Sequence, residues 1–201
     1  MSAWAGDAVD RVTRAVADAE SRTSAEFVVV VAPRSGTYTD VAWRVAAGVA
    51  AAQWLLAVLA PFDVHPVALG LELAISWPIS LWLGGSAFCA RWLTTTKRRA
   101  RQVEDAALRA FMTEVVHGTA GRNGVLIYVS VAEGRATWVA DLGIYGRVAP
   151  GTLADVSPRL AQGSADAVVA AISDLGERLA VAFPRLAGDA NELSDAPRVH
   201  T

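Results

Sequence analysis

Cysteine is almost absent from this 201-residue chain, since Cys89 is the only one. A single cysteine excludes an intramolecular disulfide framework and a metal site built from several thiolates. Lysine is equally scarce, with Lys97 alone, and the formal net charge is −2 at pH 7. The chain therefore has no global basic field, and we expect no nucleic-acid partner.

Recognised catalytic signatures are also missing. The chain has no GxGxxG, no P-loop, no GxSxG and no HExxH. The histidines at 65, 117 and 200 fall in a loop, at a helix end and near the C-terminus, so we do not expect them to converge. The first twenty residues carry charges throughout and lack the apolar core of a signal peptide. This predicts that the N-terminus stays in the cytoplasm.

Two long stretches without a formal charge, residues 45–60 and 73–90, stand out instead. As helices they would be about 24 and 27 Å long, close to the roughly 30 Å of a bilayer's hydrocarbon core. Both are apolar around their whole circumference, as helices in contact with lipid are. The alternative is a soluble protein with two apolar core helices, but a fold of this size could hardly bury both on every side. The sequence therefore predicts a transmembrane hairpin, with the lipid bilayer as a partner.

Basic residues lie on only one side of this hairpin. Residues 61–72, which join the two stretches, contain no lysine or arginine, whereas the outer flanks contain seven. By the positive-inside rule, this predicts a two-span protein of the cell membrane with both termini in the cytoplasm. Glu72 then marks the outer boundary of the second helix, or lies in the membrane as a functional suspect if that helix starts at Val67. The flanking basic residues are Arg34, Arg44, Arg91, Lys97, Arg98, Arg99 and Arg101.

The basic run at 97–101 has three interpretations. Anchoring the hairpin just inside the membrane is the one we favour, and binding to anionic lipid headgroups follows from the same position. Nucleic-acid binding is least favoured, because no aromatic platform or second basic patch accompanies the run.

The remaining elements predict an α/β fold. Amphipathic helices are expected at residues 3–21 and 102–117, and buried strands at 27–32 and 124–131. A partner strand is expected at 135–140, and a mostly helical segment at 152–183 with a break near Gly163. This order predicts a small αβα sandwich with helices flanking a short mixed sheet, into which the hairpin is inserted.

The predicted domain organisation follows from these elements. Residues 1–40 form the first part of the α/β domain, 41–93 the hairpin and 94–187 the remainder of the domain. Residues 188–201 are polar, and we expect them to be a loose tail.

Two acidic residues bracket the strand at 135–140. Asp141 is expected either to cap a turn, which we favour, or to offer oxygen ligands to a hard cation such as Ca²⁺ or Mg²⁺. Glu133 is expected to be an ordinary solvated surface residue. The two are too far apart along an extended strand to share one ion.

Five pieces of the chain, taken in order, resemble the TPM domain. They are T-x-x-E-F-V-V-V at 23–30, A-L-R-A-F at 107–111, T-x-x-x-N-G-V-L-I-Y-V-S at 119–130, A-D-L-G-I at 140–144 and F-P-R-L-A-G-D-A-N-E-L at 183–193. The last is similar to the end of the membrane-bound bacterial members. Together the pieces cover most of the chain outside the hairpin.

The resemblance implies an αβα sandwich, often tethered to a membrane. Some relatives are described as acid phosphatases or as binding divalent cations, and plant relatives act in photosystem repair. Relatives with metal sites often carry an acidic residue directly before N-G-V-L, where this chain has Arg122 followed by Asn123. Asp141 is the acidic position carried over as a metal ligand.

Two classes of function remain open at this stage. The first is a non-catalytic, membrane-tethered module that binds a protein or lipid at the cytoplasmic surface, favoured by the missing acid and the lack of clustered catalytic groups. The second is a metal-dependent phosphatase acting on phosphate esters, with Ca²⁺ or Mg²⁺ polarising the substrate. It requires Asp141, Asp155 and Glu26 to converge in a cleft.

Overall fold

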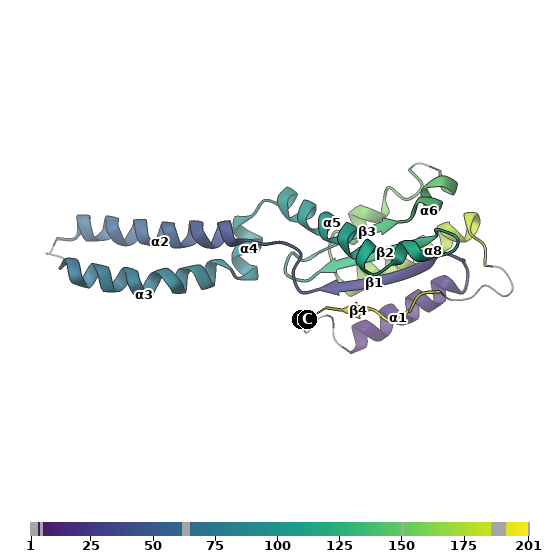
Figure 1. Ribbon diagram of the computed structural model, residues 1–201, viewed down its shortest axis with the longest axis horizontal. Coiled ribbons are helices and arrows are strands. Elements are labelled where there is room, and N and C mark those ends of the chain that lie inside the picture. The colour runs from purple at the N-terminus through teal and green to yellow at the C-terminus, as the bar shows by residue number, and fades with distance from the viewer. Residues whose placement is uncertain (1–3, 5, 62–64, 150, 186–191, 201) are drawn as a thin grey trace. The chain divides into compact units, whose positions relative to one another are not determined.

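The computed structural model describes residues 4, 6–61, 65–149, 151–185 and 192–200, and the chain divides into two compact units. One is residues 1–35 with 100–201, the α/β unit, and the other is residues 36–99, the hairpin unit. The elements in chain order (Figure 1) are α1 (Asp7–Glu20), β1 (Glu26–Ala32), α2 (Thr39–Leu59), α3 (Pro66–Gly84), α4 (Ala87–Leu93), α5 (Thr96–Thr113), η2 (Val116–Gly118), β2 (Gly124–Ser130), β3 (Arg135–Ala140), α6 (Leu142–Arg147), α7 (Val156–Leu160), α8 (Ala165–Ala182) and β4 (Arg198–Val199).

A four-stranded mixed sheet, in the order β3-β2-β1-β4, forms the centre of the α/β unit. β1 is parallel to β2 and β4, and β2 is antiparallel to β3. Every residue of β1 and β2 is buried, as the continuous apolar runs predicted. The α/β fold class expected from the order of elements is therefore confirmed.

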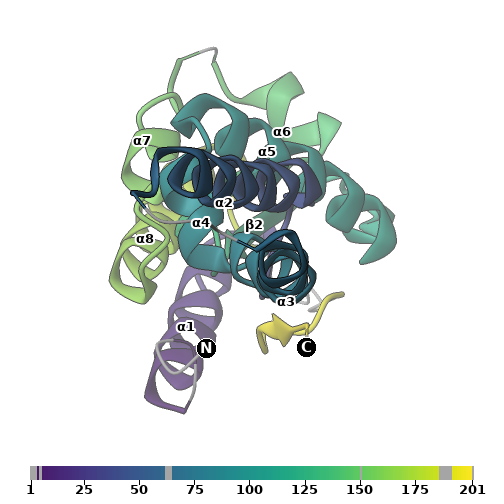
Figure 2. The same cartoon turned by 90° about the vertical axis from the view of Figure 1, so that its left-hand side faces the viewer.

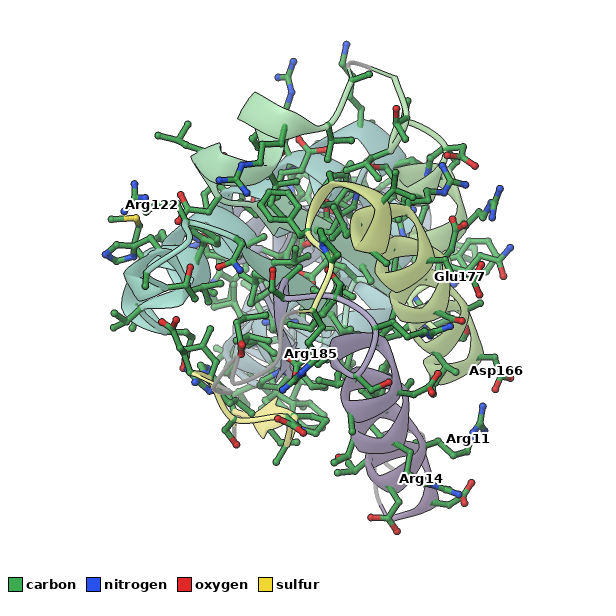
Figure 3. All side chains as sticks on the ribbon, turned by 90° about the vertical axis from the view of Figure 1, so that its right-hand side faces the viewer. Arg11, Arg14, Arg122, Asp166, Glu177 and Arg185 are labelled. Carbon is green, nitrogen blue, oxygen red and sulfur yellow. The ribbon has the colours of Figure 1, made fainter. Side chains whose placement is uncertain are left out.

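Helices cover both faces of this sheet because the side chains of β1 alternate between them. Phe27 and Val29 join one apolar cluster with residues of α1, α7 and α8, whereas Val28 and Val30 join a second cluster with residues of α5. An ion pair between Arg11 of α1 and Asp166 of α8 links the two long helices of the first layer (Figure 3).

The hairpin unit contains two helices that are long and apolar enough to cross a membrane. α2 and α3 have 21 and 19 residues, both are strongly apolar, and less than a fifth of the apolar stretch of each is buried inside the protein. They lie side by side in both views (Figures 1 and 2). Apolar side chains cover their outer surfaces, and Leu59 and Trp82 are 70% and 78% exposed. Exposing so large an apolar surface to water is unfavourable, whereas the hydrocarbon core of a membrane accommodates it.

Three contacts hold the inner faces of α2 and α3 together. The Ser76 hydroxyl donates to Gln53 Oε1 at 3.0 Å. The rings of Trp43 and Trp77 meet edge to face, with centroids 5.8 Å apart. At the C-terminal end of α3, a Cβ on Gly84 would lie 2.7 Å from the Cα of Ala42, so the two helix backbones approach so closely here that only glycine fits. Small residues at such a crossing are typical of packed membrane helices.

The second apolar helix differs from the predicted 73–90. It begins at Pro66, where proline suits the first helical position and the His65 side chain accepts from the amide of Val67. It ends at Gly84, and the rest of the apolar run forms the separate helix α4. Glu72 therefore lies in the second turn of α3 instead of marking its start. The absence of charge defined the predicted run, whereas capping residues define the helix.

The C-terminal tail is not loose over its described residues 192–200. Val30 and Val31 of β1 pair in parallel with Arg198 and Val199, and the amide of His200 donates to the Val31 carbonyl at 2.9 Å. Arg198 also forms an ion pair with Glu114 at the end of α5. The tail docks because β1 would otherwise present unpaired backbone groups at the edge of the sheet. Residues 188–191 and 201 lie outside the described residues.

Candidate functional site

The beginning of β1 and β2 and the end of β3 lie at one end of the sheet. Glu26 pairs with Gly124, and Val125 pairs with Ala140, so the polar residues next to these positions are brought to the same end. Figure 3 views the α/β unit from this end, with Arg122 and Arg185 labelled. We call this region, with its carboxylates at Glu20, Glu26 and Asp141, the acidic sheet end.

Asp141 is the predicted metal ligand, and it caps α6. Its Oδ1 accepts from the amide of Leu142 at 2.7 Å, and the side chain is only 3% exposed. Its Oδ2 lies 3.3 Å from Nε of Arg122, as an ion pair without hydrogen-bond geometry. Both carboxylate oxygens therefore face a positive or hydrogen-bearing group of the protein itself.

Arg122 is held firmly in this position. Its backbone is left-handed with φ 50°, and its Nη1 donates to the carbonyl of His117 at 3.0 Å. Its carbonyl accepts from the amide of Gly143, where a Cβ would lie 2.4 Å from that carbonyl oxygen. The glycine of the A-D-L-G-I piece is thus required by close backbone approach. Arg122 supplies the positive charge next to Asp141.

The other carboxylates named for a metal site are engaged elsewhere. Glu26 accepts from the amide of Leu193 at 3.2 Å. Asp155, directly before α7, forms ion pairs with Arg159 of α7 and Arg178 of α8. Within the described residues, no three His, Cys, Asp or Glu side chains are grouped so that they could hold a metal ion. The donor set around Asp141 does not fit a hard cation, because its nearest charged neighbour is itself a cation.

Glu20 is a buried carboxyl at this end that the sequence pattern did not reveal. It is 4% exposed, and its Oε1 accepts from the amide of Phe27 at 2.8 Å. Burial, and then the nearby Glu26 and Asp195 carboxylates, raise the pKa of Glu20 to about 8, although the Phe27 hydrogen bond opposes the shift. Burial likewise raises the pKa of Glu26. The only sequence signal was a glutamate at the end of an amphipathic helix just before a buried strand.

Glu133 is buried, which corrects the prediction of a solvated surface residue. It is 1% exposed, and both carboxylate oxygens accept from the amide of Ser35, at 3.3 and 3.2 Å. The Ser130 hydroxyl also donates to it. Buried carboxylates need such partners. Here the partner is the segment that follows β1, so Glu133 fixes the point where the chain leaves the α/β unit.

An apolar pocket of about 430 Å³ lies beside α6, the helix that Asp141 caps. It is lined mainly by Trp138, Ile144, Tyr145, Val148 and Leu153. The Trp138 indole N–H donates to the Ser157 hydroxyl at 2.9 Å and so orients the ring at the pocket wall. Among the described residues that line it there is no Asp, Glu, Lys, Arg or His, so the pocket offers mainly apolar contact.

The two ends of the hairpin unit are joined by an ionic cluster. Asp40, at the start of α2, accepts two hydrogen bonds from Arg98 of α5, at 2.7 and 2.6 Å, and is also paired with Arg44. The guanidinium of Arg98 lies over the ring of Tyr38, 5.8 Å from its centroid. Arg44 and Arg98 therefore share one carboxylate partner, Asp40.

These features define a mixed α/β protein with two helices of membrane-spanning length and composition. No family model matches the sequence, and no curated protein matches it. Among solved structures, the chain is similar to the NMR structure of the BA42 protein from the psychrophilic bacterium Bizionia argentinensis. The two share 18% sequence identity over 98% of this chain and 94% of the other, with a TM-score of 0.59. At this identity the likeness concerns the fold alone.

Proposed function

We propose that this chain is an integral membrane protein in which α2 and α3 anchor a TPM-like α/β unit to the cytoplasmic face of the cell membrane. The unit acts there as a non-catalytic interaction module. The observation that carries the proposal is the exposed apolar surface of the two helices, which the α/β unit's own core does not need.

The acidic sheet end supports a role without catalysis. Asp141 is used as a helix cap and an ion-pair partner of Arg122, and Glu26 is used to bind the backbone of Leu193. A metal-dependent phosphatase needs several carboxylates free to converge on one ion. No observation on the described residues favours that second candidate.

The topology is tested with single cysteines in the full chain carrying Cys89→Ser. Cysteines placed at Pro61 and at Val181 are expected to react differently in intact cells with a membrane-impermeant maleimide, because the loop faces out and the α/β unit faces in. The cysteine at position 61 is expected to be labelled directly, and the cysteine at position 181 only after permeabilisation. The reverse pattern would overturn the orientation, and removal of the protein by carbonate washing would overturn the membrane anchoring.

Metal binding is tested by calorimetric titration of the detergent-purified protein with Ca²⁺ and Mg²⁺. We expect no saturable binding at millimolar cation, because Arg122 faces the Asp141 carboxylate. Asp141→Ala is expected to lower the free energy of unfolding by about 1 kcal/mol through loss of the α6 cap, whether or not cation is present. Saturable binding that disappears in Asp141→Ala would contradict the proposal and restore the phosphatase alternative.

A further inference from the structure

α4 is a short helix that does not continue α3. The amide of Gly85 closes α3 by donating to the Leu81 carbonyl, and the Ser86 hydroxyl then accepts from the amide of Cys89 as the N-cap of α4. Within the hairpin unit, α4 runs across the ends of α2 and α3 instead of extending either (Figure 1). If α2 and α3 cross a membrane, a helix in this direction lies along its surface.

One side of α4 is packed against the hairpin unit. Ala90 is buried in a small apolar cluster with Tyr38 and Val41, against which Val45 and Cys89 also pack. This contact fixes the rotation of α4 about its own axis. The opposite side of the helix is therefore the side presented to the surroundings.

That opposite side carries two large aromatic residues one helical turn apart. Phe88 and Trp92 are 69% and 77% exposed, and their ring centroids are 6.0 Å apart. Two neighbouring aromatic rings are costly to leave in water, whereas a membrane interface accepts both their apolar faces and the indole N–H.

Two exposed basic residues lie close to this aromatic pair along the chain. Arg91 lies between the two rings in sequence, Lys97 follows within the next helix, and both are exposed. Neither is ion-paired within the described part of the chain, unlike Arg44 and Arg98, which both pair with Asp40. The sequence has no Asp or Glu between Glu72 and Glu104. The complementary partner is an anionic surface.

We infer that α4 is an interfacial helix, and that Arg91 and Lys97 bind the phosphate headgroups of anionic phospholipids while Phe88 and Trp92 insert beside the acyl chains. An aromatic pair next to unpaired basic residues, on a helix that crosses the end of a membrane-length hairpin, matches this partner in both polarity and charge. The inference rests on the proposed membrane anchoring and adds a lipid class to it.

The depth of α4 is measured with nitroxide labels in the full chain, reconstituted in vesicles of phosphatidylcholine with phosphatidylglycerol. In a Cys89→Ser background, labels are placed in Trp92→Cys, in Leu56→Cys as the hydrocarbon control and in Val181→Cys as the aqueous control. The label at 92 is expected to be relaxed by oxygen and protected from a water-soluble nickel chelate, whereas the label at 181 shows the opposite. A label at 92 in water with one at 56 in hydrocarbon would overturn this inference and leave the proposed function standing, whereas both labels in water would overturn both.

The charge selectivity is measured with spin-labelled phosphatidylglycerol and phosphatidylcholine, as the ratio of their association with the protein. The wild-type chain is expected to favour phosphatidylglycerol by up to about fivefold per basic residue at low salt. Arg91→Gln with Lys97→Gln is expected to reduce this ratio, whereas Arg14→Gln with Arg109→Gln, which removes the same charge, leaves it unchanged. Equal association of both lipids with the wild type, or an equal loss in both double variants, would overturn the headgroup assignment.

Discussion

Gly84→Ala is expected to lower the free energy of unfolding of the hairpin unit by about 1–3 kcal/mol, the usual effect of overpacking. The added methyl group would lie 2.7 Å from the Cα of Ala42 and 3.0 Å from the Cβ of Val45, so α2 and α3 would have to separate. The measurement is calorimetric melting of the purified protein in one detergent.

Gly70→Ala is the matched control in the same helix, because a Cβ there meets nothing within 4 Å. It removes one helical glycine just as the test variant does, so it is expected to leave stability unchanged or to raise it by up to about 1 kcal/mol. Ala42→Gly is not expected to rescue Gly84→Ala, since the clash is with the Ala42 backbone. Equal effects of Gly84→Ala and Gly70→Ala would show that α2 and α3 do not pack at this crossing.

Glu20→Gln is expected to remove a strong pH dependence from the stability of the α/β unit. Folding raises the pKa of Glu20 from 4.5 to about 8, mainly through burial. Below 4.5 the carboxyl is protonated in both states, and its contribution to stability is fully present. As pH rises from 4.5 to about 8, the unfolded chain ionises first, so this contribution is progressively lost.

The loss sums to a few kcal/mol, since one pKa unit corresponds to about 1.4 kcal/mol. Glutamine has the shape of the protonated acid and can still accept from the Phe27 amide, so the variant should match the wild type at pH 5 and exceed it at pH 9. Denaturant unfolding followed across this range measures the difference. Glu104→Gln, at an exposed position of α5, should retain the wild-type profile. A wild-type profile in Glu20→Gln as well would mean that Glu20 ionises normally in the folded protein.

The elements with strong local patterns could be predicted from the sequence alone. The run from Phe27 to Ala32 and the segment at 135–140 are strands in the structure, and Gly163, with φ 62°, separates α7 from α8 as expected. The six-residue helix α6 was missed, because a stretch containing two glycines lacks helical periodicity. Its Asp141 cap and its packing through Ile144 stabilise it.

The sites were less predictable, because burial depends on segments far apart in the chain. Glu20 and Glu133 are polar residues at ordinary helix and turn positions, and nothing local distinguishes them from solvated carboxylates. The hydrogen-bond partner of Glu133 is the amide of Ser35, almost a hundred positions earlier in the chain. Glu20 lies beside Glu26 and Asp195. Arg122 was recognised as a departure from an acidic position, but its contact with Asp141 required the turn that Gly143 permits.

The sequence by itself determined the α/β class and the presence of two apolar helices, because hydrophobic periodicity and uncharged length are local properties of the chain. Only the tertiary structure decided that α2 and α3 pack closely at Gly84, that the tail pairs with β1, and which carboxylates are buried. Those outcomes depend on backbone close approach at Gly84, on an unpaired sheet edge and on desolvation by distant residues, and none of these has a local signature.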